Sequence, residues 1–239
     1  MTMSLDLPLA ETGGEAPSPL PVVDLYRDIH KGIRSELFAI ASTAGHLDPD
    51  DHGDRAALHD HIVAMAGVLE SHAHHEDVVI DPVLAVHLPD LAVRIQHDHV
   101  RIERRFEEIV ERAADLVRAS ASDRRPASHH LYLELADFTG AYLTHQDLEE
   151  RTVMPALEAA VGAETTHSMF VEIVESIPPD EMARSLAFML PAMNVLDRVE
   201  MLEGIRASAP PPAFETIVGL ARSVLTPIDF DQLVVQLGL

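Results

Sequence analysis

The sequence predicts an all-α protein, an up-down-up-down four-helix bundle with a C-terminal helical extension. Apolar residues make up 47% of the chain but aromatic residues only 4%, with no Trp, and this composition favours helices over a β-sandwich or barrel. In four segments, apolar side chains recur with the four–three spacing of a bundle helix. Short polar turns separate these segments, as expected for antiparallel neighbours.

The elements follow in order along the chain. Residues 1–20 carry Pro, Gly, Ser and Glu without periodicity and predict a disordered tail. The bundle is expected over residues 21–160, with Pro21 in the first turn of its first helix. The four expected seams consist of Val22, Tyr26, His30, Ile33, Leu37, Ile40 and Ala44; Leu58, Ile62, Met65, Leu69, His72, Glu76 and Val79; Leu91, Ile95, His99, Ile102, Phe106, Ile109, Ala113 and Leu116; and Leu131, Leu135, Phe138, Tyr142, His145, Glu149 and Thr152.

The extension, residues 161–239, is divided by prolines. Five shorter helices are expected between them, at 164–177, 180–191, 195–206, 212–225 and 229–237. The extension is rich in Met, an adaptable apolar filler, and His167 is its only histidine. Its role stays open at this point: a cap that completes the bundle, or a lid, a substrate channel or a homodimerisation surface.

Charge and cysteine content exclude several classes of function. The net charge is −23, so the chain repels nucleic acid and anionic membranes, and neither is an expected partner. The absence of Cys excludes disulfides, thiolate zinc sites and iron–sulfur clusters, which leaves His, Asp and Glu as strong metal ligands. No signal peptide and no membrane-spanning apolar run are evident, so a cytoplasmic location is expected.

Two copies of one motif interrupt the apolar seams. His72 is followed four residues later by Glu76, and His145 by Glu149, and in each copy an acid follows the Glu and a Pro stands six residues after it. The i, i+4 spacing places both side chains on one helix face, where they can reach one metal centre. The prolines, Pro82 and Pro155, are expected to end or kink the helices.

The spacing alone is weak evidence, because His-x-x-x-Glu also occurs at His99/Glu103 and His130/Glu134. A single seam histidine is as often a satisfied core residue as a ligand. Six polar seam residues spread over four helices are different, since buried carboxylates are costly unless they are paired or bound to metal. They therefore indicate a metal centre, formed by His30, His72, Glu76, His99, His145 and Glu149.

The order of these residues predicts a paired centre. The first two helices supply His and then His-x-x-x-Glu, and the next two supply the same set again. A helical hairpin that occurs twice would supply one half of a two-metal site from each copy. Four imidazoles and two carboxylates suit iron better than manganese or zinc, and carboxylates shared by two metals can bridge them.

These residues resemble the hemerythrin-like (HHE cation-binding) proteins over about residues 22–158. The resemblance implies a non-heme di-iron centre inside the bundle, with two Fe ions joined by an oxo or hydroxo bridge. Carried over by position, one iron would be bound by His30 and His72, and the other by His99 and His145. The bridging carboxylates would be Glu76 and Glu149.

The sequence departs from the oxygen-carrying members of that family. Those have a second His one turn before the third-helix His, where this chain has Ile95. Their last carboxylate is usually an Asp five residues after its His, whereas Glu149 follows His145 by four. The pattern is similar to the bacterial His, His-x-x-x-Glu, His, His-x-x-x-Glu type, and it argues against reversible oxygen carriage.

Neighbouring residues leave alternatives open. Glu103 could bind metal in place of the ligand missing at Ile95, or it could be a solvated side chain. Tyr26 and Tyr142 could be core residues, or their hydroxyls could touch the site or a bound oxygen species. The remaining histidines near the motifs are expected at the surface, with His75 as the first candidate for an exception: His74, His75, His97, His129 and His130.

The expected function is redox chemistry with a small oxidant, namely dioxygen, peroxide or nitric oxide. Oxidation of an organic substrate and catalase-like peroxide dismutation are both compatible with it, and an organic substrate or a protein partner could meet the extension. The alternative is an oxygen-, redox- or iron-sensing or O2-binding module without turnover. A single buried site argues against iron storage.

Overall fold

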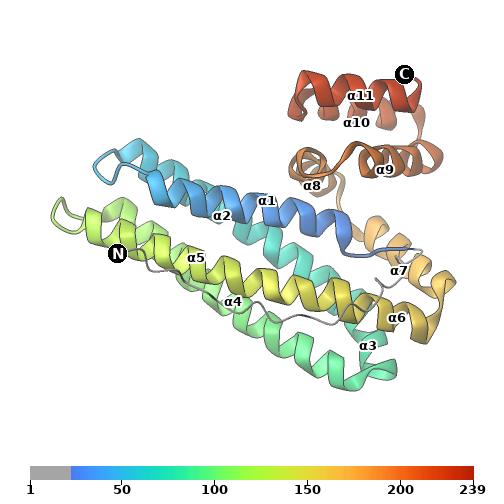
Figure 1. Ribbon diagram of the computed structural model, residues 1–239, viewed down its shortest axis with the longest axis horizontal. Coiled ribbons are helices and arrows are strands. Elements are labelled where there is room, and N and C mark those ends of the chain that lie inside the picture. The colour runs from blue at the N-terminus through green and yellow to red at the C-terminus, as the bar shows by residue number, and fades with distance from the viewer. Residues whose placement is uncertain (1–22) are drawn as a thin grey trace, which may run out of the picture.

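The computed structural model describes residues 23–239, which form helices joined by short turns (Figure 1). The bundle consists of α1 (Arg27–His46), α2 (His52–His75), α4 (Pro89–Arg118) and α5 (Arg124–Leu148). Contacts run from α1 to α2, α2 to α4, α4 to α5 and α5 back to α1, which closes the bundle. The predicted all-α bundle is confirmed, whereas the predictions for residues 1–22, including the disordered tail, lie outside the described residues.

The first helix begins later than predicted. Tyr26 is its N-cap residue and Arg27 its first residue, and the Asp24 carboxylate accepts from the backbone N–H groups of both. Two backbone N–H groups at the start of the helix, which have no partner within it, are thereby hydrogen-bonded, and the helix can begin at this point.

Of the two outcomes expected at Pro82 and Pro155, an end of the helix or a kink, the helix end is wrong. Two π-helical turns, η1 (Glu76–Ile80) and η2 (Glu149–Val153), begin at the motif glutamates, and α3 (Asp81–His87) and α6 (Met154–Val161) continue each helix past its proline. In an α-helix, Pro would clash with the carbonyl four residues earlier and would lack the N–H to bond it. The widened turn avoids the conflict, since the N–H groups of Asp81 and Met154 bond to carbonyls five residues back, and each Pro then stands in the first turn of the next α-segment.

The π-turns also shift the buried face by one residue. Thr152, predicted on the seam, is exposed, and Val153 is fully buried in its place. In the first copy both Val79 and Ile80 are buried. A turn that holds more than 3.6 residues breaks the helical spacing on which the seam prediction rested.

The bundle interior has two apolar clusters. The turn-side cluster surrounds Ile33, Leu37, Ile109 and Phe138 and ends at Tyr142. The π-side cluster begins at Tyr26 and consists of that residue with Val79, Ile80, Leu84, Ala92, Ile95, Leu148, Val153, Met154, Leu157 and Met169. The six polar seam residues belong to neither cluster and lie in the helix segments between them.

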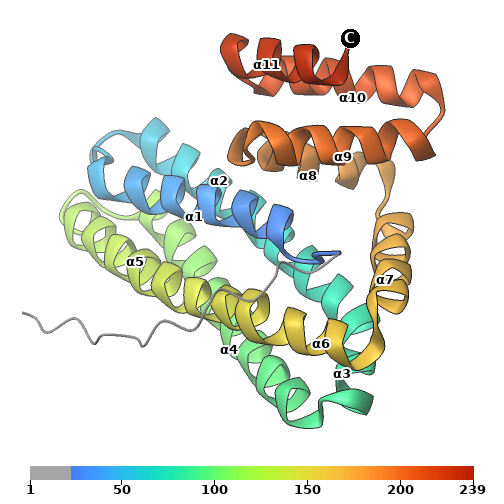
Figure 2. The ribbon, with the colours of Figure 1, turned by 45° about the vertical axis from the view of Figure 1, so that its right-hand side comes forward.

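The five predicted helices of the extension are confirmed to within two residues at each end. They are α7 (Ala163–Ser176), α8 (Pro179–Ala192), α9 (Val195–Ser208), α10 (Pro211–Val224) and α11 (Pro227–Leu237). Four of them start at a Pro or at a capping Asn, as helix starts favour. While α7 packs on α6 and η1, the last four helices, here called the C-terminal unit, enclose an apolar core of their own and lie against α1 (Figures 1 and 2).

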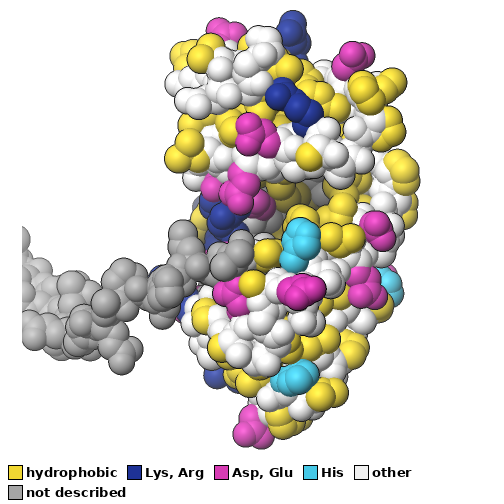
Figure 3. Space-filling view, turned by 90° about the vertical axis from the view of Figure 1, so that its right-hand side faces the viewer, with side chains coloured by type: hydrophobic (Ala, Val, Ile, Leu, Met, Phe, Trp, Pro, Cys, Tyr) yellow, Lys and Arg dark blue, Asp and Glu magenta, His cyan; other side chains and the backbone are white. Residues whose placement is uncertain are grey.

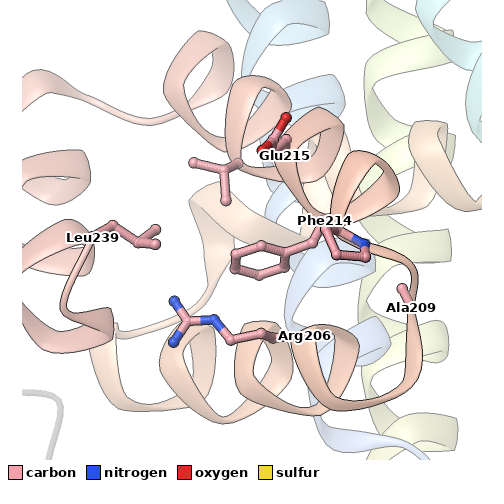
Figure 4. Close-up of a pocket in the computed structure, with 7 residues that line it drawn as sticks. Arg206, Ala209, Phe214, Glu215 and Leu239 are labelled. Carbon is pink, nitrogen blue, oxygen red and sulfur yellow. The ribbon is translucent and has the colours of Figure 1, made fainter.

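The C-terminal unit also contains an open pocket of about 400 Å³ (Figure 4). Its lining comes from α9, α10 and the chain end, with the Arg206 guanidinium 4.9 Å from the centre of the Phe214 ring. No bundle residue lines it, so the pocket is separate from the level of the six polar seam residues, here called the polar layer. Within residues 23–239, no helix combines the length and hydropathy needed to cross a membrane.

Candidate metal centre

The six polar seam residues converge at one level of the bundle. His30 comes from α1, His99 from α4, and the two motifs span the junctions of α2 with η1 and of α5 with η2. Five of the six residues are buried, and the side chain of the sixth, His72, is 9% exposed. The structure therefore brings together all six side chains that the sequence selected from 15 histidines and 40 acids.

These side chains form two groups with the spacing of metal-ligand sets. His30 and His72 make one group with the two glutamates, and His99 and His145 make the other with the same two glutamates. Within each group the candidate ligand atoms lie within 4.8 Å of one another. Each group thus has two imidazoles of its own and shares both carboxylates with the other.

The individual carboxylate oxygens face different groups. Oε1 of Glu76 lies 3.1 Å from Nε2 of His72, and its Oε2 lies 3.0 Å from Nε2 of His99. Oε1 of Glu149 lies 3.0 Å from Nε2 of His145, and its Oε2 lies 3.4 Å from Nε2 of His30. Each glutamate therefore offers one oxygen to each pair of histidines, as a bridging carboxylate does.

The inward atoms are close together, and several of them have no hydrogen-bond partner. Glu76 Oε1, both oxygens of Glu149 and His99 Nε2 are fully buried and have no hydrogen-bond partner. Nε2 of His30 and Nε2 of His72 form a hydrogen bond of 3.1 Å. Buried polar atoms without partners destabilise a fold by about 1–3 kcal/mol each, and bound cations would satisfy all of them at once. The donor set fits a pair of metal ions.

The pKa values of these groups reflect the crowding. Burial raises the pKa of Glu76 to about 8, and the charge of Glu149 adds to the effect. Burial also opposes ionisation of Glu149, yet the His145 and His99 imidazoles hold the pKa of that carboxyl well below its usual range. Two carboxylates at this depth cannot both be ionised at low cost without added positive charge. Metal ions would supply that charge.

The histidines respond in opposite directions. Burial lowers the pKa of His99, but Glu149 and Glu76 outweigh it and raise the value to about 11. Burial, with repulsion from His30, holds the pKa of His72 well below its ordinary value. Because metal ligation requires neutral imidazoles, a metal entering this layer must displace a proton from the His99 side.

The outer nitrogens of His99 and His30 are hydrogen-bonded to acids from the opposite helical hairpin, here called the crosswise acids. Nδ1 of His99 donates to Oδ1 of Asp77 at 3.0 Å, and Nδ1 of His30 donates to Oε1 of Glu150 at 2.9 Å. Arg34 Nη1 donates to the same oxygen of Glu150 at 2.7 Å. A proton fixed on Nδ1 leaves the Nε2 lone pair free to face a metal.

Sequence reasoning found these two acids but gave them no role. Asp77 and Glu150 each follow a motif glutamate, in the same position of the two copies. From its own helix, each holds the histidine of the opposite hairpin. The signal that could have revealed their role is that the acid recurs in both copies.

Both candidate tyrosines border the polar layer. The ring centre of Tyr26 lies 5.3 Å from that of His30, and the ring centre of Tyr142 lies 5.9 Å from that of His145. Burial raises the pKa of both phenols well above the usual value, and the charges of Glu76 and Glu149 raise it further. Both hydroxyls are therefore protonated near neutral pH, and each phenol lies at the border of one apolar cluster.

The other residues weighed from the sequence lie outside the six. Glu103 is exposed on α4 and belongs to neither ligand group, while Ile95 is 2% exposed in the π-side cluster. His75 is half-buried, with Nδ1 3.2 Å from Oγ of Ser176, and the other four histidines expected at the surface are exposed.

One buried carboxylate was missed. Asp81 is 5% exposed, lies near Asp77 and His99, and has its pKa raised by burial. In the second copy the same position, directly before the proline, is the buried Met154. The sequence signal that could have revealed it is the difference between the two copies, Asp81 in one and Met154 in the other.

Comparisons with known proteins agree with this geometry. The family model described as "Hemerythrin HHE cation binding domain" matches residues 22–157, more than half of the chain. The protein named "Zinc finger protein BRUTUS" from Arabidopsis thaliana is similar, with 23% identity over 211 residues. That match covers 87% of this chain but only 16% of the length of the relative. No solved structure matches.

Proposed function

The chain belongs to the hemerythrin HHE cation-binding family, and from that premise we propose that it holds a non-heme di-iron centre that reacts with a small oxidant. The oxidant would be dioxygen, peroxide or nitric oxide. The observation that carries the proposal is that Glu76 and Glu149 each face both pairs of histidines. One isolated metal would not need both carboxylates in both ligand groups.

The donor types favour iron. Imidazole and carboxylate suit iron in both its ferrous and ferric states, whereas the chain has no thiolate to favour zinc. When bound, a pair of irons supplies one-electron redox steps and coordination positions for a small molecule.

The remaining residues prepare the layer for such chemistry. Asp77 and Glu150 orient two of the histidines and increase their donor strength. The phenols of Tyr26 and Tyr142 are protonated and can donate a proton or a hydrogen bond beside the centre. Ile95 gives no ligand one turn before His99, so the protein would supply one ligand fewer to a metal on that side.

Access favours small reactants. All six ligand residues are buried or nearly so, and apolar clusters lie on both sides of them along the bundle. A bulky organic substrate would have to part these clusters, whereas a diatomic molecule or peroxide needs far less space. We therefore place oxidation of an organic substrate below direct reaction with the oxidant.

The second candidate is a sensing module without catalytic turnover. The observation in its favour is that the C-terminal unit contacts residues directly beside three of the ligands. The two candidates differ in turnover, because a sensor needs only to bind or change its oxidation state once.

The experiment is to load the protein with iron, reduce it without oxygen, and mix it with peroxide or with oxygen. Repeated consumption of peroxide, or of oxygen with a reductant, at a rate proportional to bound iron would support an enzyme. One round of oxidation without turnover would support the sensor. An iron-loaded protein that reacts with none of these oxidants would contradict the proposal. The Glu103→Gln variant, altered at an exposed site, is the matched control.

A further inference from the structure

The C-terminal unit touches α1 beside the ligand His30. Lys31, the next residue and the chain's only lysine, forms an ion pair with Asp197 of α9. One turn earlier, the Arg27 guanidinium lies 3.2 Å from a carboxylate oxygen of Glu200. Figure 3 shows this side of the molecule, with basic and acidic side chains meeting where the unit borders the bundle.

The packing at the same level is close. Gly32 is buried beneath α8, and a Cβ atom added there would lie 2.6 Å from the Phe188 ring and 3.2 Å from Met189. The glycine lets the α1 backbone approach the aromatic ring directly, so a small movement of α1 must move α8 or open this contact.

The unit and its linker also touch α2 beside the other two ligands of the first hairpin. Ser71, the residue before His72, donates its hydroxyl to Glu181 of α8. His75, the residue before Glu76, lies 3.6 Å from the same carboxylate and 3.2 Å from Ser176 at the end of α7. Each first-hairpin ligand therefore has a sequence neighbour held by the segment from Ser176 onward.

The second hairpin lacks such contacts. Among residues 23–239, no hydrogen bond or ion pair joins α4 or α5 to the C-terminal unit. The unit is thus bonded directly to α1 and α2, which carry the first hairpin's half of the centre, and not to α4 or α5.

We propose that docking of the C-terminal unit on α1 and α2 is coupled to metal occupancy of the centre. Metal ions would hold His30, His72 and Glu76 in one arrangement, and so fix the two helices that the unit contacts. Without metal, the carboxylate oxygens of Glu76 and Glu149 that lack partners destabilise this arrangement, and the His30–His72 hydrogen bond alone holds α1 and α2 together at this level, so the contacts at Gly32, Ser71 and His75 loosen. Because such coupling is reciprocal, the docked unit also strengthens metal binding.

This inference rests on the proposed function only in requiring that the six residues bind metal. It needs neither iron in particular nor any reaction with an oxidant. Redox-inert Zn²⁺ therefore serves as a probe, and a failure to react with peroxide or oxygen would leave the coupling intact.

The first arm of the test is hydrogen–deuterium exchange of the full chain, metal-free and after loading with Zn²⁺ or ferrous iron. Metal is expected to slow exchange in α8, through Phe188, by about fivefold or more relative to α10 and α11, which share the same unit but not the contact. Equal changes in α8 and α10–α11, or none, would overturn the proposal.

The second arm measures the reciprocal effect. The double variant Glu181→Gln, Asp197→Asn neutralises the two carboxylates of the unit that contact Ser71, His75 and Lys31, and leaves every ligand in place. Its metal affinity, measured at equilibrium by competition with a chelator, should be at least about fivefold lower than that of the matched control Glu203→Gln, Asp231→Asn. The control changes exposed acids of the same unit. An affinity at the control's level would overturn the proposal even if the first arm succeeded, because linkage must act in both directions.

Discussion

The two helical hairpins of the bundle share the residues that build the centre. His30 and His99 are 69 residues apart, and the buried positions that follow them match at the same interval, as at Ile33/Ile102 and Ile40/Ile109. The motif helices match at an interval of 73, through the glutamate, the acid, the π-turn and the proline. What both halves keep is the ligand set, the crosswise acid and the apolar register.

The hairpins differ in what surrounds the ligands. Tyr26 stands one turn before His30, where the second hairpin has Ile95, and the buried Asp81 corresponds to Met154. Arg34 donates to Glu150, whereas Asp77 is half exposed, and within residues 23–239 the hydrogen bonds and ion pairs between these two hairpins and the C-terminal unit all involve the first hairpin. In the proposed centre, the common part would hold the two metals, and the differences would make the two metal positions inequivalent.

Removal of a shared carboxylate should have the largest effect. Glu149→Ala and Glu76→Ala should each abolish most binding at both metal positions, since each glutamate belongs to both groups. His145→Ala, in contrast, removes a ligand from one group only and should lower iron content less. Iron per chain after loading is the measurement, with Glu103→Ala as the control. A Glu149→Ala protein that keeps its full iron content would refute the bridging role.

Removal of the metal should destabilise the bundle next most strongly. A ligand at 100 times its Kd adds about 2.7 kcal/mol to stability, which for a chain of this size corresponds to a melting temperature about 5–10 °C higher. Thermal melts with and without chelator, followed by circular dichroism, measure the difference. Identical melting curves would show that the polar layer is stable without metal.

The metal-free protein should also lose stability as pH rises above about 6.5. The folded-state pKa values of Glu76, about 8, and His99, about 11, lie above their unfolded values, so the folded state binds more protons in this range. Its stability then falls as pH rises through those values. Denaturant unfolding from pH 6.5 to 9 should show this decline. The metal-loaded protein should not, because its ligands are already deprotonated. A rise in the stability of the metal-free form over this range would contradict the assignment.

Substitution of the crosswise acids, Asp77 and Glu150, should lower metal affinity by a smaller amount, and the amount should differ between the two hairpins. Glu150→Gln and Asp77→Asn should each weaken metal binding by about 10–100-fold. Glu150→Gln should cost more, because Arg34 and His30 both lose an ionised acceptor, while Asp77 is 49% exposed and solvent compensates its loss. Competition with a chelator gives the affinities. Arg151→Gln, at an exposed neighbouring position, is the control.

Substitution of Ile95 should change the iron content least. Ile95→His should leave the iron content nearly unchanged but slow oxidation of the reduced protein by oxygen, since it adds a donor one turn before His99. Rapid mixing with oxygen, followed by the visible spectrum, measures the rate, and Ile95→Leu controls for packing. Oxygen uptake by the unaltered protein that reverses on removal of oxygen would restore the carrier interpretation.

The sequence predicted the bundle because four amphipathic segments repeat one spacing, and their polar exceptions all face inward. It could not predict that Thr152 leaves the seam, because the π-turn arises from a conflict between Pro155 and the preceding helix that changes the spacing itself. The role of Asp77 was hidden for another reason. It holds a histidine on a different helix, and such a contact depends on how the helices pack. Docking of the C-terminal unit over Gly32 likewise follows from tertiary packing alone.

The most direct test of the paired centre is the iron content of the loaded protein, measured together with its electron paramagnetic resonance spectrum in the fully ferric state. Two irons per chain are expected, with little signal, because two ferric ions joined by shared carboxylates couple magnetically. One iron per chain, or two with the full signal of isolated ferric ions, would show that Glu76 and Glu149 do not join a metal pair.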